Sequence, residues 1–178
     1  MPPPSAVSNS IESYLRDVPD FPKPGIVFKD ITPLLASPEG LQLSIDMLAE
    51  LVDPDSYDVI AGIESRGFIF GVPLATKLGK GFVPIRKPGK LPFTTVSVSY
   101  ELEYGTDTVE IHTDALEGTP RVLIVDDLLA TGGTMAAAIE LIRKVGGTPV
   151  ACALVIELGF LPGRDKLDGV PAHALVTV

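Results

Sequence analysis

Short hydrophobic runs rich in β-branched residues alternate along the chain with segments in which apolar residues recur every three or four positions. The runs, each typical of a buried strand, cover residues 57–63, 82–86, 121–125, 148–156 and, more weakly, 172–178. Helical periodicity covers residues 11–18, 37–52, 68–79 and 135–144. Because strands and helices alternate, the pattern predicts an α/β fold, with a mostly parallel central sheet flanked by helices in a single domain.

One long stretch shows neither a continuous apolar run nor the spacing of three or four residues that indicates a helix. Residues 91–103, LPFTTVSVSYELE, are rich in threonine, serine and β-branched residues but lack a long apolar face. We expect a mobile β-ribbon flap over about residues 87–107, since a long loop with little to bury is most often a functional lid. Val109 and Ile111 alternate with polar neighbours, which predicts a half-exposed strand returning from the flap.

The N-terminal end is expected to form a tail and a short hood. Residues 1–10 hold almost nothing apolar, so we expect a disordered tail, followed by the domain over residues 11–178. The opening lacks the basic start and apolar core of a signal peptide, and no run approaches the roughly 18 apolar residues of a membrane span. A cytoplasmic protein without contact to the membrane is the simplest expectation.

The most informative stretch is RVLIVDDLLATGGT, residues 121–134. Its strand is expected to end at Asp126 and Asp127, because a buried charge without a partner costs more than a strand residue gains. Small residues then allow a tight turn into the next helix: Ala130, Thr131, Gly132, Gly133 and Thr134. Backbone N–H groups and the positive end of a helix dipole converge at such a turn, with threonine hydroxyls as further donors. The stretch therefore predicts a phosphate-binding loop.

Other phosphate-loop families fit this stretch poorly. It lacks the lysine of a Walker A loop and the GxGxxG spacing of a dinucleotide site. A receiver domain also places paired aspartates after a strand, but it does so at the start of its fold, whereas only residues 128–178 follow here. A solvated acidic pair or a simple Gly-Gly turn would each be ordinary alone, and their combination in this order favours a site.

Composition narrows the class of ligand. The net charge is −9 and the pI is near 4.6, so nucleic acid and anionic membranes would be repelled. An anionic ligand would need local cations, and Arg66, Lys87 and Lys90 follow the ends of two predicted strands. Guanidinium and ammonium groups in such a position suit a diphosphate.

The stretch VLIVDDLLATGGT resembles the phosphoribosyl pyrophosphate binding motif of the phosphoribosyltransferases. Three further stretches strengthen the resemblance: FPKPGIVFKDITPLL at 21–35, ESRGFIFG at 64–71, and RKPGKLP with SYELEYG between 86 and 105. The resemblance extends from about residue 14 to about residue 157. It implies a phosphoribosyltransferase-type fold and transfer of the phosphoribosyl group to adenine, giving AMP and diphosphate in purine salvage.

The resemblance also implies a role for each part of the site. The loop of residues 130–134 would hold the 5′-phosphate, Asp126 and Asp127 would accept from the ribose hydroxyls, and the three cations would neutralise the diphosphate. The implied adenine pocket consists of Val27, Phe28, Lys29 and Leu128, with the Phe28 ring against the base. Glu103, directly before a tyrosine-glycine pair, is the implied catalytic acid. The family further implies Mg²⁺, held mainly by substrate oxygens and water, and a homodimer.

Two alternatives stay open. A non-catalytic regulator could use this fold to sense phosphoribosyl pyrophosphate while binding nucleic acid, although no added basic domain is visible in a chain of net charge −9. A transferase for another base, such as hypoxanthine, guanine or orotate, would also carry the phosphate-binding loop. The residues at positions 27–29 and 126–134 favour adenine, but the chemistry of the sequence alone does not decide between purines.

Overall fold

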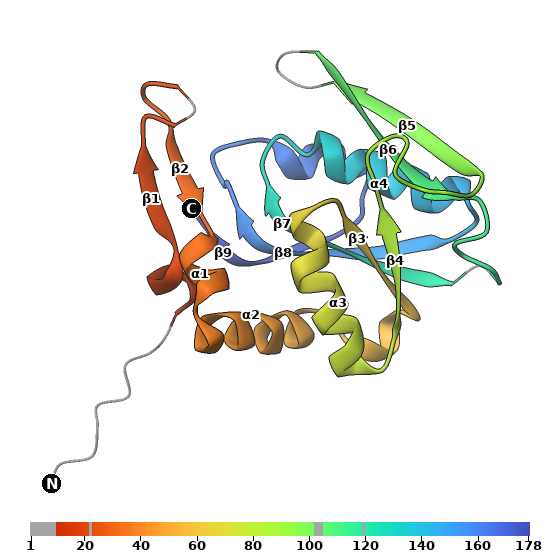
Figure 1. Cartoon of the computed structure of the whole chain (residues 1–178), viewed down its shortest axis with the longest axis horizontal. Coiled ribbons are helices and arrows are strands. Elements are labelled where there is room, and N and C mark those ends of the chain that lie inside the picture. Colours follow the sequence, from red (N-terminus) through yellow and green to blue (C-terminus); the bar gives the residue numbers. More distant parts are fainter. Residues whose placement is uncertain (1–9, 22, 102–104, 119) are drawn as a thin grey trace, which may run out of the picture. The chain divides into compact units, whose positions relative to one another are not determined.

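The computed structural model describes residues 10–21, 23–101, 105–118 and 120–178 (Figure 1). Contacts within the chain divide it into two compact units, residues 1–44 and residues 45–178. The expectation of a single domain over residues 11–178 stays a prediction. All but Ser10 of the expected N-terminal tail lies outside the described residues.

The first unit is built on a two-stranded antiparallel sheet, β1 paired with β2. Its elements are η1 (Ile11–Tyr14), β1 (Arg16–Pro19), β2 (Val27–Asp30), α1 (Thr32–Ala36) and the start of α2 (Pro38–Leu51). The sequence predicted a helix over residues 11–18, and that prediction is wrong beyond Tyr14. Cross-strand ion pairs favour the extended form there, since Arg16 Nη2 lies 2.6 Å from the Asp30 carboxylate and Lys29 Nζ lies 2.6 Å from that of Asp17.

The helix predicted over residues 37–52 is confirmed as α2. Ser37 precedes it, and its hydroxyl accepts a hydrogen bond of 3.0 Å from the backbone N–H of Gly40. A serine in this position satisfies one of the N–H groups that the first turn of a helix leaves without a partner. The cap and the proline at the first helical position therefore fix where the helix begins.

The second unit is built on a five-stranded sheet of order β4-β3-β7-β8-β9, in which every neighbouring pair is parallel. Its strands are β3 (Val59–Ile63), β4 (Gly81–Ile85), β7 (Arg121–Leu129), β8 (Thr148–Glu157) and β9 (Ala172–Thr177). Its further elements are η2 (Pro54–Ser56), α3 (Arg66–Leu78), α4 (Gly133–Lys144) and η3 (Gly163–Lys166). The predicted parallel sheet flanked by helices is confirmed.

The predicted ribbon is present as β5 (Thr95–Glu101) paired antiparallel with β6 (Thr106–His112). It buries more than the sequence suggested, because Val98, Val109 and Ile111 join the hydrophobic core formed with α4. Figure 1 shows the ribbon lying along that helix. The flap's mobility stays a prediction, and its tip at residues 102–104 lies outside the described residues.

Apolar burial accounts for the interior of the second unit. Alternate residues of β3 and β7, such as Ala61 and Ile124, pack with α4 and the ribbon. Cys152 is fully buried on β8, and burial raises the pKa of its thiol to about 12, which suits a small core residue rather than a reactive one. None of the described helices is both long enough and apolar enough to cross a membrane.

Candidate active site

The acidic pair lies inside strand β7, which continues to Leu129. The sequence predicted that the strand would end before Asp126, and that prediction is wrong. Asp127 is only 5% exposed, but its carboxylate forms an ion pair with Arg66, the first residue of α3. Because the buried charge has a partner, β7 can continue past both aspartates and stay paired with β8 as far as Leu129.

Asp126 lies beside this pair in a different electrostatic environment. Burial raises the pKa of its carboxyl well above the usual range, and the neighbouring charge of Asp127 raises it further. The backbone N–H of Asp127, which donates to Asp126 Oδ1 over 2.9 Å, acts in the opposite direction but does not outweigh them. A carboxyl group with a raised pKa, that of Asp126, therefore lines the same cavity as the ion-paired Asp127.

The turn between β7 and α4 requires glycine. Gly132 has φ +80°, and a Cβ atom placed there would come within 2.2 Å of the carbonyl oxygen of Gly163. A glycine cap has no side chain to accept from the first turn of α4, so those N–H groups are left for solvent or a ligand. The first helical bond runs from Ala136 N–H to the Gly132 carbonyl, 2.9 Å long. Residues 130–134 thus form a glycine turn into the N-terminus of α4, and their role in binding a phosphate stays a prediction.

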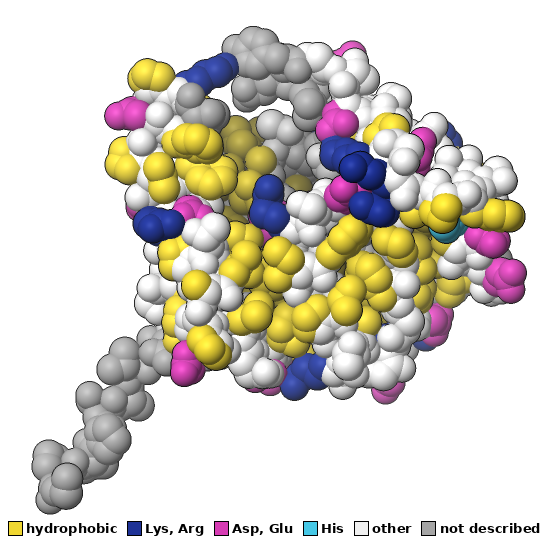
Figure 2. Space-filling model, viewed as in Figure 1, with side chains coloured by type: hydrophobic (Ala, Val, Ile, Leu, Met, Phe, Trp, Pro, Cys, Tyr) yellow, Lys and Arg dark blue, Asp and Glu magenta, His cyan; other side chains and the backbone are white. Residues whose placement is uncertain are grey.

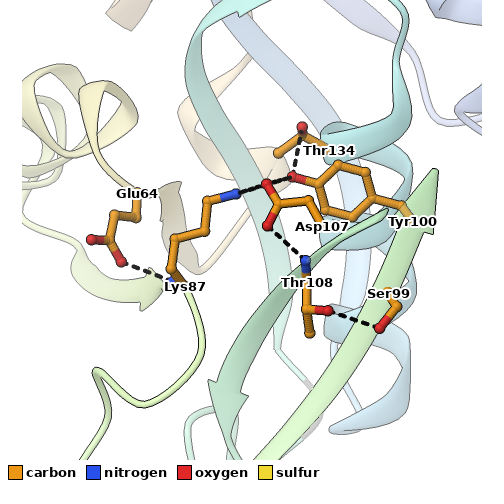
Figure 3. Close-up of polar contacts among 7 residues, drawn as sticks. All are labelled: Glu64, Lys87, Ser99, Tyr100, Asp107, Thr108 and Thr134. Carbon is orange, nitrogen blue, oxygen red and sulfur yellow. Dashed lines mark hydrogen bonds and ion pairs between the residues drawn. The ribbon is translucent and has the colours of Figure 1, made fainter. Parts of the chain in front are cut away.

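Cations face this loop from two other elements. Burial alone would lower the pKa of the Arg66 guanidinium, but the hydrogen bond and charge of Asp127 outweigh it and raise that pKa. Lys87 follows β4, and its backbone N–H donates to Glu64 over 2.8 Å. The Lys87 ammonium reaches Asp107 and the Tyr100 hydroxyl on the ribbon (Figure 3). Two of the three predicted cations, Arg66 and Lys87, therefore have a carboxylate partner.

These groups line one cavity of about 320 Å³ in the second unit. The predicted residues that it brings together are Arg66, Lys87, Asp126, Asp127, Leu128, Ala130, Thr131, Gly132, Gly133 and Thr134. Lys90 is exposed and is not among the lining residues. The lining combines two cations, a glycine loop with a helix N-terminus and the acidic pair, so the cavity suits a ligand that carries phosphate groups.

Comparison with known proteins agrees with this geometry. A family model described as phosphoribosyl transferase domain matches residues 30–168. Adenine phosphoribosyltransferase of Thermobifida fusca is 58% identical over 172 residues, which cover 97% of this chain and 98% of that one. The chain belongs to the adenine phosphoribosyltransferase family.

Solved structures of adenine phosphoribosyltransferases share its fold. The enzyme of Thermoanaerobacter pseudethanolicus superposes with a TM-score of 0.89 at 54% identity, covering 94% of this chain and 98% of that one. The enzyme of Saccharomyces cerevisiae, solved with an imino-altritol bisphosphate and adenine, has a TM-score of 0.86 at 43% identity, covering 93% and 96% of the two chains.

Besides Lys90, three residues implied by the resemblance, Val27, Phe28 and Lys29, are not among the described residues that line this cavity. Val27, Phe28 and Lys29 form part of β2 in the first unit, where the Val27 side chain is exposed and the Phe28 ring meets the Phe21 ring edge-on at 5.2 Å. The Lys29 ammonium is held by Asp17, so a contact from Lys29 to a base would use its backbone. Glu103 lies outside the described residues. The roles of these residues in this adenine phosphoribosyltransferase stay predictions.

The sequence analysis missed Tyr100 and Asp107, two ribbon residues that line the cavity. The signal was present in the alternation that identified β6, because Asp107 shares the period-two face of buried Val109 and Ile111. Tyr100 is the cross-strand partner of Asp107. A polar residue on the buried face of an otherwise apolar pattern indicates a functional contact, and here it identifies the ribbon side of the site.

Proposed function

We propose that this member of the family transfers the 5-phosphoribosyl group from 5-phospho-α-D-ribose 1-diphosphate to adenine, giving AMP and diphosphate. The observation that carries the proposal is that the glycine loop of residues 130–134, the pair Asp126 and Asp127, and the cations Arg66 and Lys87 line the same cavity. A glycine loop before a helix, two carboxylates and two cations in one cavity match the groups of a sugar that carries a phosphate and a diphosphate.

In the proposed reaction, the loop holds the 5′-phosphate through backbone N–H groups and the Thr131 and Thr134 hydroxyls. Asp126 and Asp127 accept hydrogen bonds from the two ribose hydroxyls. Positive charge develops at the anomeric carbon as the diphosphate leaves, and negative charge on the acidic pair stabilises it. Of the two carboxylates, that of Asp127 forms the ion pair with Arg66.

Arg66 and Lys87 would stabilise the departing diphosphate, and Lys90, which is exposed beside this region of the chain, would add long-range charge only. Mg²⁺ would be carried mainly by diphosphate oxygens and water, and the carboxylate oxygens of Asp126 and Asp127 on the cavity wall are of the kind that this ion prefers. When bound through diphosphate oxygens and water, the ion would supply neutralisation of the leaving group.

For the base, we propose that the Leu128 side chain forms part of the adenine site. Leu128 follows the acidic pair on β7 and lines the cavity, where its apolar side chain suits the face of a purine. Glu103 is proposed to donate a proton to purine N7 when the ribbon closes. Closure would desolvate a carboxyl there and raise its pKa toward the range useful for a general acid.

We further propose a homodimer in the cytoplasm. Ile69 and Val72 on α3 are large hydrophobic residues with 37% and 45% of their surface exposed, and Figure 2 shows hydrophobic side chains gathered over this helix. An exposed apolar helix face of this kind suits a self-complementary interface. Analytical ultracentrifugation of the chain and of an Ile69→Glu variant tests this, and a parent protein that sediments as a monomer would contradict it.

The function is tested by incubating the chain with phosphoribosyl pyrophosphate, Mg²⁺ and one base at a time, and measuring the nucleotide formed. We expect adenine to be consumed far faster than guanine, hypoxanthine or orotate. Equal turnover of guanine would refute the base assignment and leave the phosphoribosyl transfer standing. Binding of phosphoribosyl pyrophosphate without turnover of any base would instead favour a sensing protein without catalysis.

A further inference from the structure

The side chain of Lys87 is held by two groups of the ribbon. Its ammonium forms an ion pair with the carboxylate of Asp107 and a hydrogen bond of 3.2 Å to the Tyr100 hydroxyl. The two charged side chains are 34% and 31% exposed, so the pair is half-buried at the wall of the cavity. Figure 3 shows the lysine extended toward the ribbon, with the carboxylate at its end.

Tyr100 connects this ion pair to the phosphate-binding loop. Its hydroxyl donates to Asp107 Oδ2 over 3.1 Å, and it accepts from the Thr134 hydroxyl in the first turn of α4, also over 3.1 Å. The Thr134 hydroxyl is one of the groups assigned to the 5′-phosphate. A continuous chain of contacts therefore joins the Lys87 ammonium to the Thr134 hydroxyl, a donor assigned to the 5′-phosphate (Figure 3).

We propose that Asp107 is an internal counterion for Lys87, which the diphosphate of the substrate must displace before it can bind that lysine. Asp107 is then a positioning residue that acts through Lys87. The inference rests on the proposed function, because it takes Lys87 as a ligand of the diphosphate.

The direction of the effect distinguishes this role from simple support of the lysine. If Asp107 competes with the diphosphate, removing its charge leaves the ammonium free, and diphosphate binds more tightly. If Asp107 only holds the lysine in a useful place, removing its charge lets the side chain move, and diphosphate binds less tightly. The Lys87 side chain is also bounded by Tyr100 and is fixed at its backbone by Glu64, so it keeps its place without the carboxylate.

The chain of contacts adds a second consequence. A 5′-phosphate that accepts from the Thr134 hydroxyl removes one donor from Tyr100 and weakens the network around Lys87. Since coupling between two ligands is reciprocal, each phosphate group should favour binding of the other. Ribose 5-phosphate should therefore increase the affinity for inorganic pyrophosphate in the parent chain, and this gain should shrink when Asp107 carries no charge.

The test is calorimetric titration of the full chain with inorganic pyrophosphate in excess Mg²⁺, with and without ribose 5-phosphate. Asp107→Asn is expected to lower the dissociation constant for pyrophosphate by about 2- to 5-fold, the range that loss of one half-exposed ion pair allows. Asp114→Asn is the matched control, because it removes the same charge from an exposed residue just beyond β6, and it should leave the constant unchanged. The gain from Asp107→Asn should disappear in a Lys87→Gln background.

Weaker or unchanged binding of pyrophosphate by folded Asp107→Asn protein would overturn the proposal, as would an equal gain in the Asp114→Asn control. Should Asp107→Asn fail to fold, Asp107→Ser removes the same charge and is expected to lower the dissociation constant for pyrophosphate in the same way. The proposed function fails separately, when the parent chain neither binds pyrophosphate nor forms AMP. A parent chain that does both while the variants show no gain refutes only the role of Asp107.

Discussion

Replacing Gly132 by alanine should damage the phosphate-binding loop through two separable effects. The first is backbone conformation, since Gly132 has φ +80°, where an L side chain is strained by about 1–2 kcal/mol. The second is collision, because the added Cβ would lie 2.2 Å from the carbonyl oxygen of Gly163 and 3.0 Å from its carbonyl carbon. Those atoms are backbone, so relief requires that the loop or the η3 segment moves, at about 1–3 kcal/mol.

Gly146 offers a matched control for the first effect. It has φ +88° at the end of α4, but nothing lies within 4 Å of a Cβ placed there. Gly146→Ala should therefore lose only the conformational part, and Gly132→Ala should lose about 1–3 kcal/mol more. For a chain of this length that difference corresponds to roughly 2–12 °C in the midpoint of thermal unfolding.

The assay combines urea unfolding, followed by circular dichroism, with calorimetric binding of phosphoribosyl pyrophosphate. Gly132→Ala should lose both stability and affinity, because the residues that move are those that present N–H groups to the 5′-phosphate. Gly146→Ala should lose stability alone. Equal losses of stability in the two variants, or an unchanged dissociation constant for Gly132→Ala, would show that the contact with Gly163 does not shape the loop.

Three further predictions follow from the acidic groups of the site. Asp127→Asn should keep the fold but slow AMP formation, because the amide retains the shape while removing charge beside the sugar; turnover at the parent rate would refute that role. Asp126→Asn should raise the midpoint of thermal unfolding at pH 8 but not at pH 4. The raised pKa of Asp126 means that its contribution to stability is present below the unfolded pKa and lost as pH rises through the folded pKa. Equal shifts at both pH values would contradict this sign. Glu103→Gln should lower kcat by roughly 10²–10⁴ with substrate binding little changed, and Glu101→Gln much less, in single-turnover measurements; a larger defect at Glu101 would reverse the assignment.

The parallel sheet could be predicted from the sequence because each of its strands is a compact apolar run between turn residues. β3, β7 and β8 are buried on both faces, so burial leaves a nearly continuous hydrophobic signature. The helix α2 was predictable for a similar local reason, a serine cap and an apolar stripe. Signals of this kind depend only on neighbours in sequence.

The errors arose where a distant partner decides the local structure. The prediction from the sequence ended β7 before Asp126, because burying a carboxylate without a partner is costly. In the structure, Asp127 has Arg66 as a partner 61 positions away. The predicted first helix extended to residue 18, but Arg16 forms an ion pair with Asp30 on the neighbouring strand. In both places an ion pair that no local pattern encodes reverses the local preference.

The same partnerships explain how an acidic chain can hold a cavity for a polyanion. Arg66 and Lys87, the two cations of the cavity, each contact a carboxylate of the second unit, Asp127 and Asp107. A cation that is already partly buried and paired inside the protein needs less further desolvation when a phosphate group arrives. Binding at Lys87 then exchanges one anion for another, and the free energy of that exchange depends on how firmly Asp107 holds the ammonium. The affinity of the site for diphosphate is therefore set as much by the acidic residues of the chain as by its basic ones.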